Sequence, residues 1–134
     1  MKTTQLTLCA AAALAMCSGA ALAAAQDKIE HLRSLAFGYR LLGEPVTDPG
    51  LAPTAAQSLD QDTAGAVDFV NAEGTVVDVT AAAHGAAFTR RWRVTPVDHF
   101  VPEALAIEVC VFRWPADGRT PANAQSCLAT VRVR

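Results

Sequence analysis

The sequence is short of charged side chains and has no basic excess. Only 18% of its 134 residues are Asp, Glu, Lys or Arg, and the formal net charge is −2. Nucleic-acid-binding domains usually carry a basic patch, so nucleic acid is not expected as the main partner.

Much of the apolar content is alanine, which makes for a thin core. A single small domain of this size buries roughly 60–70% of its unfolded surface. Such a domain would benefit from a covalent staple or from neighbouring subunits.

Motifs for catalysis and for metal binding are also missing. There is no CxxC or Cys/His spacing typical of zinc sites, and no serine lies in a G-x-S-x-G elbow. His31, His84 and His99 are scattered, without a carboxylate or cysteine at ligand spacing. We therefore expect no enzyme activity, no catalytic residues, no cofactor and no metal.

The N-terminal run 3–26 carries no charge and follows Lys2. One interpretation is a secretory signal with Leu6–Met16 as its apolar region and a small-residue cleavage site within Ala21–Ala25. The other is a membrane or stalk helix, because the run is long enough to span a bilayer. Both interpretations export the rest of the chain. They divide it into an apolar helical segment, 1–25, and a globular domain, 26–134.

A helix is predicted over about Ala20–Leu35. Its apolar stripe has alternating steps of three and four residues, which is typical of one buried helix face: Leu22, Ala25, Ile29, Leu32 and Ala36. We expect Ile29 and Leu32 to dock this helix onto a sheet. The helix should stop near Gly38. Glycines and prolines then predict a loop over 43–65.

The second half of the chain reads as short strands. Residues 67–79 predict a hairpin in which Gly74 supplies the left-handed turn position. A plain turn also explains Asn71 and Glu73, which with Asp68 could otherwise suggest calcium. Further strands are predicted over 88–94, 105–114 and 127–134. The expected fold class is α+β, with a long N-terminal helix packed on a small antiparallel sheet.

The strand over 88–94 contains three arginines. Arg91 and Arg93 fall on one face, and Arg90 falls on the other face with Trp92. A solvated sheet face is one interpretation of these arginines, and a contact with an acidic partner is the other. Trp92 and Trp114 are expected to pack in the core or on a sheet face.

The four cysteines form two groups. In a helix, Cys9 and Cys17 would lie ~12 Å apart along the axis, which is too far for a disulfide. Cys110 and Cys127 flank the loop 115–125, so a hairpin folded there brings them opposite one another. An exported domain meets oxidising conditions, in which such a bond persists. We therefore predict a disulfide between Cys110 and Cys127.

Several segments together resemble the minor pilins of type IV pili and the related pseudopilins, which belong to the prepilin family. The matching pieces are QDKIEHLRSL at 26–35, VDFVNAEGTVV at 67–77, FTRRWRVTP at 88–96 and the closing CLATVRVR. The family's N-terminal signature, Gly-Phe-Thr-Leu-Ile-Glu, is absent from this sequence, and we expect an in-frame reading upstream of Met1 to encode it.

The resemblance implies a non-enzymatic subunit of a type IV pilus or of a type II secretion pseudopilus. It implies other pilin or pseudopilin subunits as partners, with the inner membrane reached through the N-terminal helix. The expected location is the cell envelope, in the inner membrane, the periplasm or an extracellular pilus. The alternative is a small secreted or periplasmic binding module with a cleaved signal peptide.

Overall fold

The computed structural model describes residues 19–39, 45–52, 59–79, 84–97, 104–114 and 123–133. Within these ranges a helix covers residues 19–34, and no helix there has the length and apolar character needed to cross a bilayer. The predicted apolar region Leu6–Met16, together with Cys9 and Cys17, lies outside the described residues.

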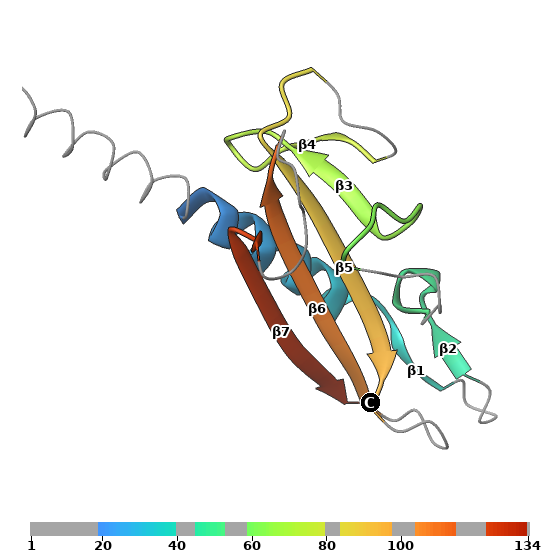
Figure 1. Ribbon diagram of the computed structural model, residues 1–134. Helices are drawn as coiled ribbons and strands as arrows, with labels where there is room; N and C mark the ends of the chain where they lie inside the picture. Colours follow the sequence, from blue (N-terminus) through green and yellow to red (C-terminus); the bar gives the residue numbers. More distant parts are fainter. Residues whose placement is uncertain are drawn as a thin grey trace, which may run out of the picture.

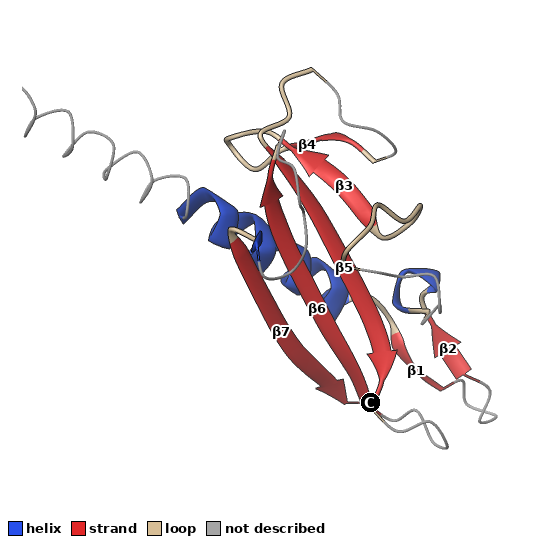
Figure 2. Cartoon of the chain, viewed as in Figure 1, coloured by secondary structure: helices blue, strands red, loops and turns tan. Residues whose placement is uncertain are grey.

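The main element is a five-stranded antiparallel sheet (Figures 1 and 2). Its spatial order is β4-β3-β5-β6-β7. The strands are β3 (Val67–Val70), β4 (Val76–Asp78), β5 (Phe88–Pro96), β6 (Ala104–Arg113) and β7 (Ser126–Val133). Apart from β3, which pairs with both β4 and β5, the neighbours follow chain order, as hairpin-connected strands usually do.

The hairpin between β3 and β4 turns as the sequence predicts. Gly74 has φ of 86°, the left-handed conformation that favours glycine. The side-chain oxygen of Asn71 accepts hydrogen bonds from the backbone N–H groups of Glu73 and Thr75, at 3.1 and 2.9 Å. Asn71 and Glu73 therefore belong to a turn, as the simpler interpretation of their sequence had it.

The helix lies across one face of the sheet, behind β6 and β7 in the view of Figure 1. Because side chains alternate along a strand, β5 turns Phe88, Trp92 and Val94 toward the helix, and β6 turns Ile107 and Val109 the same way. These side chains and the buried helix residues form one core cluster, whose helix members are Ala21, Ala24, Ala25, Ile29 and Leu32.

The expected fold class, a long N-terminal helix packed on a small sheet, is wrong. The described chain is mostly β, and its one described helix is short. Two long strands, β5 and β6, dominate the sheet. The expected stripe was also misplaced at its start, since Leu22 is 40% exposed while Ala21 and Ala24 are buried. The small alanine side chains allow the helix to lie close to the sheet. Which helix residues are buried therefore depends on the face they occupy, and the larger Leu22 stays outside because it is on the other face.

The region after the helix also departs from expectation. The helix ends at residue 34, and Gly38 lies within β1 (Phe37–Tyr39), which pairs with β2 (Pro45–Thr47). The predicted loop 43–65 therefore contains a strand, followed by the 3-10 turn Pro49–Leu51. Strands of three residues are too short to show an apolar period. The prediction of a loop therefore followed the glycines and prolines of this region.

Candidate functional site

The clearest polar feature is a buried ion pair on the sheet face that the helix covers. Arg90 and Asp68 are paired residues on β5 and β3 and are 5% and 3% exposed. The guanidinium binds the carboxylate in a bidentate manner: Nε lies 2.7 Å from Oδ1 and Nη2 lies 2.7 Å from Oδ2. The third nitrogen, Nη1, donates to the carbonyl oxygen of Ala24 in the helix at 2.9 Å. Because both charged groups are hydrogen-bonded in this way, the energetic cost of removing them from water is offset.

Lys28 joins this cluster from the helix. Its Nζ lies 3.5 Å from Asp68 Oδ2 and 3.6 Å from the ring centroid of Trp92. The ammonium thus rests on an aromatic face in a cation–π contact. Burial lowers the pKa of Lys28 below its usual value, and the neighbouring Asp68 carboxylate only partly opposes that shift. Lys28, Arg90 and Asp68 together carry one excess positive charge on the helix side of the sheet.

An open pocket of about 580 Å³ lies beside this cluster. Its lining includes Lys28, Asp68 and Trp92, and the apolar side chains of Val67 and Val79. Because β4 pairs with β3 only at Phe69 and Val70, no described strand pairs with Val67 and Asp68 on this side of β3, beside the pocket. Asp62 completes the charged part of the lining, and the rest of the wall is mostly apolar. A mostly apolar pocket with a few charged groups is typical of small-ligand binding sites.

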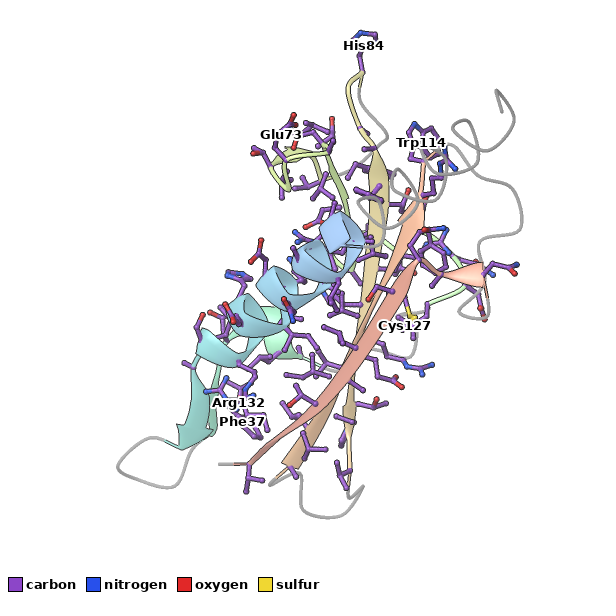
Figure 3. All side chains as sticks on the ribbon, turned by 90° about the vertical axis from the view of Figure 1, so that its left-hand side faces the viewer. Phe37, Glu73, His84, Trp114, Cys127 and Arg132 are labelled. Carbon is purple, nitrogen blue, oxygen red and sulfur yellow. A yellow bond between two sulfur atoms is a disulfide. The ribbon has the colours of Figure 1, made fainter. Side chains whose placement is uncertain are left out.

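The residues considered as metal ligands do not come together in the part of the chain that the structure describes. Among the described residues, no group of three or more His, Cys, Asp or Glu side chains could hold a metal ion. His31 lies on the exposed face of the helix, and His84 projects from the end of the sheet (Figure 3). His99 lies outside the described residues. Asp68, considered for calcium, is instead the partner of Arg90.

The arginines of β5 do not form a solvated face. Arg91 is 3% exposed, on the face away from the helix. It donates to Asp62 Oδ1 at 2.8 Å and to the carbonyl oxygen of Leu59 at 3.1 Å, and its guanidinium lies 4.9 Å from the ring centroid of Phe112. Only Arg93 fits the solvated interpretation, in a partly exposed pair with Glu108. Strand alternation assigned the faces correctly, but it could not show that residues 59–62 cover Arg91.

A second arginine contact fixes the other end of the helix. Arg132, on β7, donates through Nη1 to the carbonyl oxygens of Leu32, at 3.4 Å, and of Leu35. These carbonyls belong to the last turn, where a helix leaves its acceptors unpaired and favours a cation. The guanidinium also lies 5.7 Å from the ring centroid of Phe37, and Figure 3 shows the two side chains together. The cap therefore comes from Arg132, and no local pattern around the helix end predicts this contact.

The remaining predicted residues are placed as follows. Cys110 and Cys127 are joined by a disulfide between directly opposite positions of β6 and β7. Ile29 and Leu32 are buried in the core cluster, which also contains residues of the sheet. Trp92 is buried in the same cluster, and the ring of Trp114 contacts Phe69 edge-on at 6.1 Å.

Sequence reasoning missed Lys28, Asp68, Arg90 and Arg132 as contacts between the helix and the sheet. The expected hairpin pairs the strand of Asp68 with the segment that follows it in the chain, so the sequence did not place Asp68 beside Arg90. Lys28 follows two other polar residues, Gln26 and Asp27, and does not stand out from them. The pairing of Arg132 with residues about a hundred positions earlier also leaves no local trace. The chain matches no family model, no curated protein and no solved structure.

Proposed function

We propose that this chain is a non-enzymatic subunit of a type IV pilus or of a type II secretion pseudopilus, with the assembly or structural role of a minor pilin. Its partners are then other pilin or pseudopilin subunits, and its N-terminal helix inserts in the inner membrane. The order and spacing of the four sequence segments that resemble this family support the proposal.

One observation carries the proposal over its alternative. Ala21, Ala24 and Ala25 are 0%, 1% and 0% exposed, and they belong to the core cluster that includes the sheet. A signal peptidase acting within Ala21–Ala25 would remove part of this core. It would also remove or expose the carbonyl group of Ala24 that accepts the buried hydrogen bond from Arg90. A helix that forms part of the core favours a retained subunit helix over a discarded leader.

The manner in which the helix is attached also suits an assembled subunit. Arg90 binds a carbonyl oxygen near the middle of the described helix, and Arg132 binds two carbonyl oxygens at its end. Lys28 adds a contact to Asp68 between these points. A subunit held in a filament by its N-terminal helix must transmit force from that helix to its sheet. Several polar contacts at separate positions along the helix provide that connection.

The alternative, a secreted or periplasmic binding module, draws on the pocket beside Lys28. Fractionation of cells that produce the tagged full chain separates the two functions. A pilus or pseudopilus subunit is expected in the inner-membrane fraction and in sheared surface filaments. Recovery of the chain only in the soluble periplasm or the culture medium would overturn the proposal in favour of the binding module.

A further inference from the structure

Lysine is the rarer of the two basic residues in this chain. Of the 11 basic side chains, Lys2 and Lys28 are lysines and all the others are arginines. Arginine makes the fixed contacts with the helix, through Arg90 and Arg132, whereas Lys28 stands where the pocket of about 580 Å³ opens. A guanidinium keeps its charge in proteins, but a lysine amine can lose its proton and act as a nucleophile. Position 28 therefore combines a cavity with an amine that can react.

Contacts with two neighbours hold the amine of Lys28 at the wall of this pocket. The carboxylate of Asp68 accepts a hydrogen bond from Nζ on one side, and the ring of Trp92 lies against Nζ on another. Asp68 and Trp92 also line the pocket, and the Lys28 side chain is only 12% exposed. A ligand that enters the pocket therefore meets an amine whose position is fixed, in place of a side chain that moves freely in water.

Burial also makes this amine more reactive than an exposed one. It lowers the pKa of Lys28, an effect that the Asp68 carboxylate opposes and the Arg90 guanidinium reinforces. A larger fraction of Lys28 is therefore neutral at about pH 7 than of an exposed lysine. Only the neutral amine has the lone pair that attacks a carbonyl carbon, and lysines that are desolvated in apolar pockets are activated as nucleophiles in this way.

The charges on the pocket wall disfavour an anionic ligand. Asp62 and Asp68 both line the pocket, whereas Arg91 and Arg90, the arginines that pair with them, are not part of its lining. A carboxylate or a phosphate in the pocket would face two carboxylates and one amine, and the like charges would repel it. An uncharged ligand avoids this repulsion and can still react with the amine of Lys28.

We propose that Lys28 forms a reversible imine with an uncharged, apolar aldehyde that binds in this pocket. The apolar part of the aldehyde lies against Val67, Val79 and the ring of Trp92, which line the same pocket. Val79 is 60% exposed without a ligand, so binding covers apolar surface that otherwise faces water. This modification site goes beyond the proposed pilin function and does not depend on it.

Imine formation at Lys28 needs no further reactant. The lone pair of Nζ forms a bond to the carbonyl carbon, and the carbon–oxygen bond breaks as the oxygen leaves in a water molecule. Counted from the ammonium form, two of the three protons on Nζ leave with that water, and the third stays on the iminium nitrogen. The adduct thus keeps the positive charge of Lys28 beside the carboxylate of Asp68 and the ring of Trp92. The groups that hold the free ammonium therefore also stabilise the adduct.

Reductive trapping tests this site in the full chain. The protein is incubated with benzaldehyde and sodium cyanoborohydride, which reduces an imine to a stable amine, and peptide mass spectrometry follows the labelling of Lys28 and Lys2. We expect Lys28 to be labelled several times faster than Lys2 in the folded protein, and the two rates to become equal in urea. The anionic probe 4-carboxybenzaldehyde should lower the ratio of Lys28 to Lys2 labelling, because its carboxylate meets Asp62 and Asp68.

A matched pair of substitutions tests the role of the pocket itself. Val79→Asp adds a charge to the pocket wall and should slow the labelling of Lys28 several-fold. Val97→Asp should leave it unchanged, because Val97 is 58% exposed and does not line the pocket.

Three results would overturn the site. They are labelling of Lys28 no faster than of Lys2, equal labelling of Lys28 in the two aspartate variants, and an equal ratio with the neutral and the anionic aldehyde. The first and third comparisons use the unsubstituted chain, so they decide the question even if a variant does not fold. None of these results bears on the pilin proposal, which fractionation tests separately.

Discussion

Arg90 donates a hydrogen bond to the carbonyl oxygen of Ala24, 66 positions earlier in the sequence, at 2.9 Å. Because the same guanidinium also holds Asp68 in a bidentate pair, one side chain connects the helix, β3 and β5. The helix is therefore part of the folded domain, and its attachment to the sheet is polar as well as apolar.

Breaking this connection should be costly. Replacing Arg90 with Met leaves the Asp68 carboxylate buried without its bidentate partner, and we expect a loss of ~3–5 kcal/mol in the free energy of unfolding. The matched control is Arg93→Met on the same strand. Its pair with Glu108 is partly exposed, with side-chain exposures of 40% and 34%, so its loss should stay below about 1 kcal/mol. Denaturant unfolding measures both, and similar losses would contradict the role given to Arg90.

Apolar docking of the helix predicts a second contrast. Ile29 is 9% exposed and lies in the core cluster, so Ile29→Ala should lower the free energy of unfolding by ~2–5 kcal/mol. The next residue, Glu30, is exposed, and Glu30→Ala should change stability by less than about 1 kcal/mol. Equal effects of these neighbouring substitutions would argue against docking through Ile29.

The disulfide should stabilise the domain by restricting its unfolded chain. Cys110 and Cys127 are 17 positions apart, and closing a loop of this length contributes ~3 kcal/mol in the chain-entropy model. Unfolding with and without a reductant measures the contribution. Mass spectrometry of unreduced peptides provides an independent check, since recovery of both cysteines in alkylated form would show that the bond is absent.

Because of Lys28, the free energy of unfolding should change with pH in the alkaline range. Burial lowers its pKa in the folded protein below the unfolded value of 10.5. Between those two pKa values the unfolded chain binds more protons, so the contribution of Lys28 to stability rises with pH. The stability of Lys28→Met relative to the unsubstituted chain should therefore fall as pH rises from 7 through this window. A difference that stays constant with pH would show that burial does not perturb Lys28.

Local patterns in the sequence account for much of the sheet. The alternation around Trp92 predicts the strand that the structure places at Phe88–Pro96, and Gly74 marks the hairpin turn. Helix periodicity also indicates that Ile29 and Leu32 share one face. In each case the information lies within a few residues of the element itself.

What the sequence could not show depends on contacts between distant segments. Arg91 reads as an exposed strand residue until residues 59–62 are placed over it. The end of the helix is fixed by Arg132 and not by the nearby Gly38. The proportion of strand was underestimated for a different reason, because β1 and β2 are too short to have a period of their own. The candidate site is built from Lys28, Asp68 and Arg90. Predicting it requires knowing which turn of the helix lies over which pair of strands.

The N-terminus of the mature protein tests most directly whether the helix is retained as part of the folded domain. Intact mass and N-terminal sequencing of the protein recovered from the cell envelope give this position. We predict a mature chain that still contains residues 19–25, because Ala21, Ala24 and Ala25 are buried in the core. A mature chain that begins at Ala24 or Gln26 and keeps its fold would contradict the account and assign the N-terminal run to a signal peptide.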